Sequence, residues 1–279
     1  MTPELEIPEA RPVRVSVVIV SLNRVEWTRQ SIEALGDAHQ VTVVDNGSTD
    51  GGSNLGAEYP HLKFHRLPKN FGLTRALNIG IRSCDGEYIL LLHDDVSISA
   101  DAVSKLADYL EVHPDAGAVA PRLTDEAGQP VKQVRALPVP AAPDPPFQPV
   151  SGEGDITVEC VSGAAIMMRS FFLRALRNID ERYGTYGSDI EICAQIRRAG
   201  KKIVIPGGVT AVHRWAGSPV SKGALEGDRV QGTAAFLGKH HGMMSALTLR
   251  LSAGLGALVT LNFGRVAGAF GGQKIDGAG

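Results

Sequence analysis

The stretch that most constrains the fold is YILLLHDD, which runs from Tyr88 to Asp95. No residue from Tyr88 to Leu92 is charged, and the run then stops at two adjacent carboxylates. An uncharged run of this length is typical of a central strand that is buried on both faces of an α/β sheet. Ligands of such sheets bind beyond the carboxyl ends of the strands. The sequence therefore predicts a buried strand that opens into a functional site at His93, Asp94 and Asp95.

The two adjacent acids need an explanation, because neighbouring carboxylates repel each other unless a cation lies close to both. A divalent metal that carries a nucleotide diphosphate would supply that cation. The alternative is a solvated acidic turn before the next helix, since Ser99 and Asp101 are typical helix-start residues. The strand end by itself leaves both interpretations open.

The bulk composition excludes several classes of protein. The chain has 279 residues, a formal net charge of -2 and a pI of about 6.4, so it has no overall basic character that would predict a nucleic-acid partner. Three widely spaced cysteines without a CxxC pattern predict reduced core thiols and a cytoplasmic location. Residues 1–12 lack an apolar segment, which predicts a loose N-terminal arm rather than a signal peptide.

Strand-like and helix-like segments alternate along the chain, which predicts a mostly parallel α/β sheet flanked by helices. A stretch with six prolines over residues 136–149 interrupts this pattern, and we expect it to be a mobile loop beside the site rather than a linker. The predicted strands cover residues 13–20, 41–44, 62–67, 88–92 and 202–206, with paired strands over 118–123 and 157–168. The predicted helices cover residues 24–35, 73–83, 171–177 and 188–199, with another around Ala102, Leu106 and Leu110.

The C-terminal part of the chain is apolar but interrupted by charge. Arg250 and Arg265 leave fourteen uncharged residues between them, whereas a membrane-spanning helix needs roughly 20 apolar residues. We expect an apolar helical tail over residues 243–279. Residues 243–270 would contact the inner face of the cell membrane peripherally, cover a homodimer contact, or pack back on their own domain.

Two further polar motifs follow predicted strands. In VVDNGSTD, Asp45 comes directly after a strand and can accept hydrogen bonds from a base N–H or a ribose hydroxyl, although an ordinary Asx turn is the alternative. In NFGLTRALNIG, Asn70 precedes a helix start and Arg75 lies in the first turn, where its charge opposes the helix dipole. We expect Arg75 to face a phosphate or an acidic neighbour such as Asp94; a solvated arginine is the alternative.

Taken together, these motifs resemble the family 2 glycosyltransferases, which have the GT-A fold. The order VSVVIVSLNR, VVDNGSTDGG, NFGLTRALNIG, YILLLHDDV, VSGAAIMMRS, IDERYGTYGSDIEICAQIRRAG, VHRWAGS and FLGKHHG spans residues 13–242. The chain is most similar to the bacterial rhamnosyltransferase-like subgroup, whose counterpart of LLHDDV usually reads LLNPDV. The resemblance implies a GT-A domain over residues 13–242, with a nucleotide-sugar-binding half over 13–115 and an acceptor-binding half over 116–242.

The resemblance also implies roles for the matching residues. Asp95 falls on the last acid of the family's DxD-like motif, which binds the metal on the diphosphate, and His93 replaces the first acid. His213 matches a histidine that completes the metal shell in some members, and a mixed oxygen and imidazole shell suits Mn²⁺ or Mg²⁺. The residues implied to bind the nucleotide sugar are Ser21, Asn23, Asp45, Asn46, Asn70, Arg75 and Asp94.

The implied catalytic base is Asp189, in the segment that matches the family's EDxD pattern. That pattern reads Ser188-Asp189-Ile190-Glu191 here, so the usual acidic predecessor of Asp189 is missing. Since a neighbouring negative charge raises the pKa of a carboxylate, its loss should make Asp189 less basic. Either burial compensates or Glu191 shares the work; a helix N-cap is the alternative role for Asp189.

The resemblance implies a metal-dependent, inverting transfer of a sugar to a hydroxyl acceptor, lipid-linked or glycan, in cell-surface polysaccharide, glycolipid or glycoconjugate synthesis. The donor would carry dTDP, UDP or GDP, with rhamnose suggested by the subgroup. The rivals are a nucleotidyltransferase, for which the chain lacks a Gly-rich basic loop after its first strand, and a non-catalytic nucleotide-sugar-binding or scaffold protein.

Trp215 and Tyr186 would stack on a sugar or lie in the core. The cluster Lys239-His240-His241 would contact phosphate or lipid headgroups, or form a solvated helix end.

Overall fold

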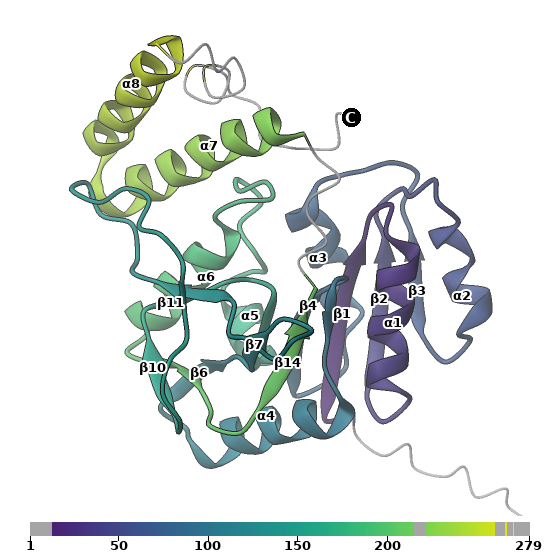
Figure 1. Cartoon of the computed structure of the whole chain (residues 1–279). Helices are drawn as coiled ribbons and strands as arrows, with labels where there is room; N and C mark the ends of the chain where they lie inside the picture. The colour runs from purple at the N-terminus through teal and green to yellow at the C-terminus, as the bar shows by residue number, and fades with distance from the viewer. Residues whose placement is uncertain (1–12, 215–220, 260–265, 267–269, 271–279) are drawn as a thin grey trace, which may run out of the picture.

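The central feature of the computed structural model is an eight-stranded sheet with the strand order β10-β13-β6-β12-β4-β1-β2-β3 (Figure 1). The structure describes residues 13–214, 221–259, 266 and 270. The strands of this sheet are β1 (Val15–Ser21), β2 (Gln40–Asp45), β3 (Lys63–Arg66), β4 (Tyr88–His93), β6 (Ala116–Val119), β10 (Ile156–Val158), β12 (Ala165–Arg169) and β13 (Lys202–Ile205).

The pairing in this sheet is mixed but mostly parallel, as the sequence predicts. Strand β1 lies between β2 and β4 and runs parallel to both, while β12 pairs antiparallel with β4 and β6. The register aligns Val20 with His93 and Ser21 with Asp45. The carboxyl ends of the three parallel strands therefore meet at one edge of the sheet.

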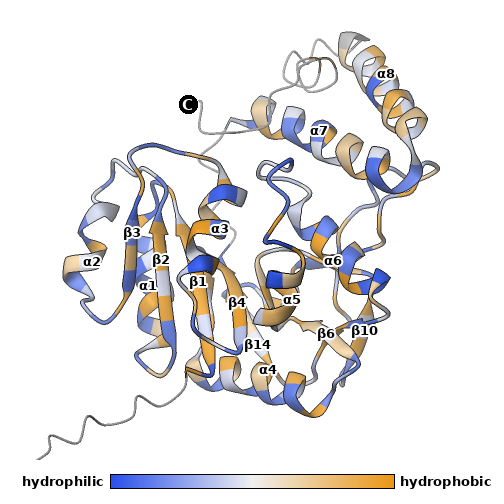
Figure 2. Cartoon of the chain, turned by 180° about the vertical axis from the view of Figure 1, so that it is seen from behind, coloured by the Kyte–Doolittle hydropathy of each residue, from blue (hydrophilic) through white to orange (hydrophobic). Residues whose placement is uncertain are grey.

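Helices cover both faces of the sheet and bury its strands. Val17 and Ile19 of β1 face one apolar cluster with α1 and α4, whereas Val18 and Val20 face a second cluster with α3 and α6. Every residue of β4 from Tyr88 to Leu92 is at most 3% exposed, which confirms the predicted buried strand. Figure 2 shows the apolar character of β1, β2 and β4. The helices are α1 (Val25–Leu35), α2 (Leu55–Glu58), α3 (Leu73–Arg82), α4 (Ala100–Val112), α5 (Ser170–Ala175), α6 (Ser188–Arg198), α7 (Lys222–His241) and α8 (Met243–Val259).

Two small sheets flank the large one. The first has the order β11-β8-β9 and contains β8 (Lys132–Arg135), β9 (Gln148–Pro149) and β11 (Cys160–Val161). The second has the order β5-β14-β7 and contains β5 (Val96–Ser97), β7 (Arg122–Thr124) and β14 (Thr210–His213). The proline-rich segment leaves β8 and returns as β9 of the same sheet, so it is a loop of that sheet.

The predicted pair of long strands over 118–123 and 157–168 is only partly correct. Ala118 does pair with Met168, but residues 116–124 divide between β6 and β7, which belong to different sheets. Pro121 lies between these two strands, and a proline has no N–H with which to continue a ladder. Residues 156–169 likewise divide into β10, β11 and β12. The three cysteines are buried free thiols, as predicted.

Helix α3 packs closely on the sheet because Gly80 has no side chain. A Cβ atom at Gly80 would lie 2.4 Å from Cγ1 of the fully buried Val18 and 3.2 Å from Cγ2 of Val44. We expect Gly80→Ala to destabilise the protein by about 1–3 kcal/mol, because the overlap outweighs the roughly 1 kcal/mol gain in helix propensity. Thermal unfolding followed by circular dichroism measures the effect.

The matched control is Gly256→Ala in α8, where a Cβ atom meets nothing within 4 Å. This variant should be neutral or slightly stabilised, because only the gain in helix propensity remains. Equal melting temperatures for the two variants would contradict a close α3–sheet contact.

Candidate active site

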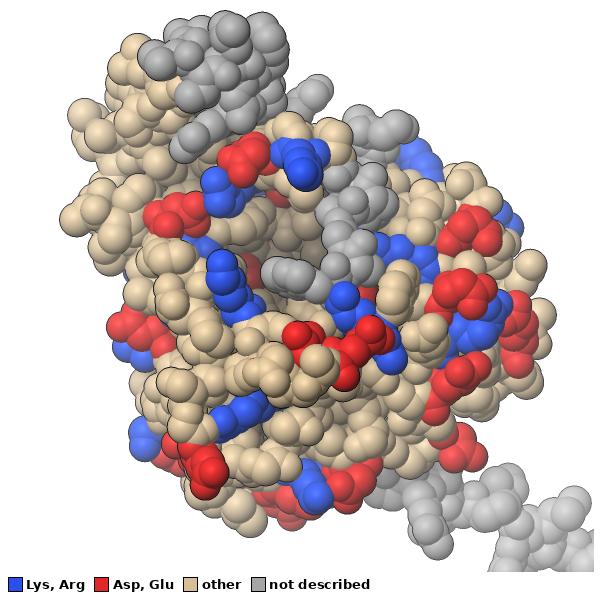
Figure 3. Space-filling view, in the orientation of Figure 1, with Lys and Arg blue, Asp and Glu red and all other residues tan. Residues whose placement is uncertain are grey.

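A cleft of about 510 Å³ lies at the edge of the sheet where β1 and β4 end. Figure 3 shows it as a hollow near the centre of the molecule, bordered by charged side chains of both signs. Of the predicted site residues, those that line the cleft are Asn46, Asn70, His93, Asp94, Asp95, Asp189 and His213. The predicted residues that do not line it are Ser21, Asn23, Asp45, Arg75 and Glu191.

Four of the predicted nucleotide-binding residues take part in two sets of hydrogen bonds between β1, β2 and α3. The side-chain Nδ2 of Asn46 donates a hydrogen bond to Asn70 Oδ1 at 3.0 Å, and the same oxygen accepts from the backbone N–H of Gly72 at 2.8 Å. The Ser48 N–H donates to Asp45 Oδ1 at 2.9 Å, and Ser48 Oγ in turn accepts from the backbone of residue 23. These contacts hold the turns after β1 and β2 against each other.

Asp45 and Ser21 do not line the cleft wall. Both residues are fully buried, and Ser21 Oγ shares a 2.7 Å hydrogen bond with Thr28 of α1. Asp45 Oδ2 lies 4.0 Å from the guanidinium of Arg66 and has no hydrogen-bond donor within reach in the described part of the chain. A buried carboxylate oxygen of this kind is able to accept a hydrogen bond from a ligand.

Three predicted metal ligands come together at the end of β4. One ligand atom from each of His93, Asp95 and His213 lies within 4.8 Å of the other two. Asp95 and His213 are buried, and His213 Nε2 lies 3.3 Å from Asp95 Oδ1. Two imidazoles and one carboxylate form a donor set that fits a divalent metal such as Mn²⁺.

The protonation states of these groups favour cation binding. Burial lowers the pKa of His93 to about 4, so the imidazole is neutral at pH 7 and keeps a lone pair. Burial alone would raise the pKa of Asp95, but the hydrogen bond from His213 and the nearby positive charges outweigh it and lower the pKa to about 2. A neutral imidazole and an ionised carboxylate are the forms that coordinate metals.

Arg24 is a site residue that the sequence motifs did not reveal. Its Nη1 lies 3.2 Å from Asp94 Oδ1 and 3.3 Å from Asp95 Oδ2, and its side chain is only 13% exposed. Burial raises the pKa of Asp94 to about 7, although the charge of Arg24 opposes this rise. The cation between the two acids in this structure is therefore an arginine. Its place in the short turn between β1 and α1 was the only sequence signal for it.

The turn that carries the two acids is supported from both sides. Ser31 of α1 is fully buried and donates from Oγ toward the carbonyls of Asp94, at 3.0 Å, and Val96, at 2.8 Å. On the other side, β14 pairs with β5 and places His213 opposite Val96. The short β5–β14 pair is what brings His213 to Asp95 from a distant part of the chain.

Asp189 lies on the cleft wall in the first turn of α6. Its Oδ2 accepts a 3.2 Å hydrogen bond from the Gly163 N–H, and its Oδ1 accepts from the N–H of Ile190 at 2.8 Å. Burial raises the pKa of Asp189, and these backbone hydrogen bonds offset only part of the rise. Burial therefore shifts the pKa of Asp189 in the direction in which an acid at position 188 would have shifted it, and the role of Asp189 as a base stays a prediction.

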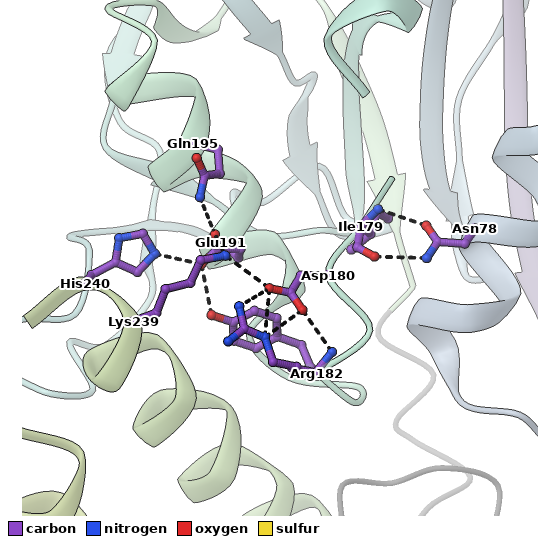
Figure 4. A network of polar contacts seen from close by, with 9 residues as sticks. Asn78, Ile179, Asp180, Arg182, Glu191, Gln195, Lys239 and His240 are labelled. Atoms are coloured by element: carbon purple, nitrogen blue, oxygen red, sulfur yellow. Dashed lines mark hydrogen bonds and ion pairs between the residues drawn. The ribbon is translucent and has the colours of Figure 1, made fainter. Parts of the chain in front are cut away.

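Glu191 points into a different environment, shown in Figure 4. Its carboxylate is 3% exposed and accepts hydrogen bonds from Gln195 at 2.6 Å, Lys239 at 2.7 Å, His240 at 2.7 Å and Tyr183 at 2.9 Å. Burial would raise the pKa of Glu191, but these four donors lower it. The carboxylate therefore holds α7 against α6 and does not face the cleft.

The same network corrects the expectation for the basic cluster at the end of α7. Lys239 also contacts Asp180 at 3.1 Å, so it belongs to the Glu191 network rather than to a phosphate site or a solvated helix end. His241 Nε2 lies 3.2 Å from the carbonyl oxygen of Pro138 in the proline-rich loop. The cluster therefore ties α7 to α6 and to that loop.

The structure also decides the neighbours of Arg75 and Tyr186. Arg75 contacts Glu181 at 3.4 Å instead of Asp94, and its side chain is about half exposed. Tyr186 lines the cleft and donates to Asp144 of the proline-rich loop at 3.0 Å, while Phe147 of the same loop also lines the cleft. Trp215 lies outside the described residues.

Comparison with known families agrees with this geometry. Residues 16–176, more than half of the chain, match the family model for glycosyl transferase family 2. The chain belongs to glycosyl transferase family 2. The matched span includes β1, β2, β4 and both acids, whereas Asp189 and His213 lie beyond it.

The curated relatives of this chain are named as glycosyltransferases. It is 23% identical over 206 residues to the N-acetylglucosaminyl-diphospho-decaprenol L-rhamnosyltransferase of Mycobacterium tuberculosis, an alignment that covers 64% of this chain and 67% of that protein. An uncharacterized glycosyltransferase of Rickettsia bellii is 40% identical over 93 residues, which is 30% of this chain. This chain spans only 13% of the length of that relative and 17% of the length of an uncharacterized glycosyltransferase of Rickettsia felis.

Solved structures share the GT-A fold with the transferase. S. aureus TarS 1-349 in complex with UDP-GlcNAc aligns with a TM-score of 0.60 and 14% identity, over 85% of this chain and 70% of that one. The mannosyltransferase PcManGT of Pyrobaculum calidifontis, in complex with GDP-Man and Mn²⁺, aligns with a TM-score of 0.54 and 16% identity over 94% of this chain and 82% of that one. At these identities the likeness shows the fold alone.

The position of Arg24 leads to a stability prediction. Arg24→Gln removes the cation shared by two buried carboxylates, so we expect a loss of roughly 3 kcal/mol in the free energy of unfolding. Mn²⁺ should raise the melting temperature of this variant more than that of the wild type, because the metal then meets two acids that the arginine no longer neutralises. Thermal unfolding with and without Mn²⁺ measures both effects.

The matched control is Arg75→Gln, which breaks a half-exposed pair with Glu181 and should cost less than about 1 kcal/mol. If both arginine variants lost the same stability, the contact of Arg24 with Asp94 and Asp95 would contribute no more than a surface ion pair.

Proposed function

We propose that this family 2 glycosyltransferase moves a sugar from a nucleotide-diphosphate donor to a hydroxyl acceptor with inversion at the anomeric carbon, and that a divalent metal assists the transfer. The observation that carries the proposal is the placement of the His93, Asp95 and His213 side chains in the same cleft as a desolvated Asp189. The three possible ligands suit a cation on a diphosphate, and Asp189 suits a general base.

The donor would lie along the edge of the sheet, with its nucleoside near the turns after β1 and β2. Support comes from the buried Asp45 Oδ2, which is available to accept a hydrogen bond, and from the amides of Asn46 and Asn70 on the cleft wall. Asp94 lies next to these groups and would meet the ribose or the donor sugar. The nucleotides to be considered are dTDP, UDP and GDP, and likeness to the mycobacterial rhamnosyltransferase supports rhamnose as a candidate sugar.

His93, Asp95 and His213 would hold the metal, and Mn²⁺ or Mg²⁺ suits their mixed shell. When bound, the metal would neutralise charge on the diphosphate that leaves during transfer. Arg24 adds a fixed positive charge beside the same acids, and it would orient Asp94 toward the donor. The Mn²⁺ in the PcManGT complex supports manganese as the first ion to test.

Asp189 would accept the proton of the acceptor hydroxyl as the new bond forms. Its raised pKa makes it a stronger base than an ordinary aspartate, while the Gly163 N–H holds its carboxylate in place. Glu191 would act as a positioning residue, because its carboxylate is enclosed by four donors that fix α6 against α7. The acceptor would enter beside Tyr186, and a glycan or a lipid-linked sugar fits this proposal.

Ligand-induced stabilisation tests the donor and metal assignments. We expect at least one of dTDP, UDP, GDP and their sugar conjugates to raise the melting temperature, and Mn²⁺ to increase that rise, because binding to the folded state stabilises it. In Asp95→Asn, the additional rise in melting temperature that Mn²⁺ causes should be absent. The control Asp101→Asn removes an exposed carboxylate in α4 and should behave like the wild type. Absence of a shift with every nucleotide would contradict a nucleotide-sugar donor.

Replacement of the proposed base tests the chemical step. Asp189→Asn should lower kcat by about 10²–10⁴-fold without changing nucleotide affinity, since it removes only the proton acceptor. In the wild type, kcat/KM should fall as the pH drops through the raised pKa of Asp189, so the acid limb should lie above the range of an ordinary aspartate. Steady-state kinetics across pH measure both quantities.

Glu191→Gln is the comparison variant for Asp189→Asn. Because Glu191 faces away from the cleft and its pKa is lowered, the substitution should reduce the melting temperature and leave the acid limb of the pH profile in place. Full turnover by Asp189→Asn, or loss of the acid limb in Glu191→Gln, would overturn the assignment of the base.

A further inference from the structure

Helix α8 presents an unusual distribution of side chains. Its large apolar residues point outward, with Met243 85%, Met244 72%, Leu247 48%, Leu251 48% and Leu255 66% exposed. Residues 243, 247, 251 and 255 recur every four positions and therefore form a continuous stripe along one side of the helix. We call these five side chains the α8 apolar face.

The opposite side of α8 packs on α7 through small residues. Ala253 and Ala257 are buried, Ala253 forms a small cluster with Val230 of α7, and Ala246 lies against Gly238. Helix α4 has the usual arrangement, with large residues such as Leu106 turned to the core. In α8 the sizes are mostly reversed: small residues make most of the protein contact, and apart from Leu249, which packs against the core, the large residues described above meet the solvent. An apolar medium outside the protein would explain this reversal.

The charge of this part of the chain is equally one-sided. No aspartate or glutamate occurs from Arg229 to Ile275, although the chain contains 30 such residues. The single charged residue of α8 is Arg250. Figure 3 shows the described surface of α8, at the upper left, without Asp or Glu side chains, whereas side chains of both signs lie along α7 and over the rest of this view. Helix α8 thus lacks the groups that an anionic surface would repel.

The shape of the hairpin suits a flat partner. Figure 1 shows α8 as an outermost element, separated from the central sheet by α7. In the described part of the chain, no helix has the length and apolar composition to cross a bilayer. A helix of 17 residues is about 25 Å long, so the apolar face forms a long, narrow strip.

We propose that the α8 apolar face docks the protein on the surface of an anionic lipid bilayer. The helix would lie in the plane of the membrane with its Met and Leu side chains among the acyl chains, as amphipathic interfacial helices do. Because α8 carries one arginine and no acidic residue, negative headgroups would not repel it. Leu225 of α7 lines the cleft, so the hairpin that binds the bilayer also forms one wall of the active site. Because this proposal concerns lipid binding alone, it is tested without any donor or acceptor.

Co-sedimentation of the full chain with vesicles tests the proposal. We use phosphatidylcholine alone and phosphatidylcholine with about one part in three phosphatidylglycerol. The wild type should bind the anionic vesicles, and L247D/L251D/L255D should bind them at least about tenfold less. The matched control is V112D/V139D/F171D, which adds the same three negative charges at exposed apolar residues outside α8 and should bind like the wild type.

A fluorescent probe makes the result independent of folding defects. The three native cysteines are buried, so Leu251→Cys offers the exposed thiol for labelling with an environment-sensitive dye. The dye at position 251 should shift to the blue when anionic vesicles are added, whereas the same dye on Phe171→Cys should not shift.

Two outcomes would overturn the proposal. Equal binding of the wild type and L247D/L251D/L255D to the vesicles, or no binding by either, would show that the α8 apolar face is not a lipid contact. A wild-type dimer in light scattering that the same variant converts to a monomer, together with absence of vesicle binding, would assign the face to a second copy of the chain.

Discussion

The burial of β1 and β4 on both faces is the constraint on which the rest of the structure depends. Neither strand carries a charged side chain along its buried length, so the first charged groups appear only beyond the strand ends. Parallel pairing aligns those ends, and Arg24, Asp94 and Asp95 consequently meet in a small, poorly solvated volume. Burial there raises the pKa of Asp94 to about 7, whereas for Asp95 the hydrogen bond from His213 and nearby charges outweigh burial and lower the pKa to about 2. Two adjacent acids thus acquire different chemical properties.

The support around this edge comes from elements that are distant in sequence. Ser31 holds the acidic turn from α1, and the β5–β14 pair delivers His213 from the other side. Across the cleft, Asp189 of α6 lines the cleft wall, whereas Glu191 of the same helix faces Tyr183 and α7. The Glu191 network then fixes α7, whose partner α8 carries the apolar face. One helix turn therefore links the proposed base to the hairpin that we propose to contact lipid.

Much of the fold was predictable because burial leaves a pattern in the sequence. The uncharged runs and the helical spacing located most of the large sheet and the helices α1, α3, α4, α5 and α6 with small errors at their ends. The misses have physical causes. Pro121 divided a predicted strand, and Glu181 replaced Asp94 as the partner of Arg75 because α3 turns that side chain away from the cleft. The cluster at Lys239 looked solvated because the sequence does not show that Glu191 lies against it.

By itself the sequence determined the central strands, the acids at their ends and the family, since these depend on local hydrophobic pattern and on motifs in a fixed order. Only the tertiary structure decided which charges meet. It placed Arg24 between the acids, joined His213 to Asp95, and raised the pKa of the half-buried Asp189 by removing water around its carboxylate. It also turned the large residues of α8 outward. Contacts between distant segments, and the loss of water around them, depend on packing in three dimensions and leave no periodic signal in the chain.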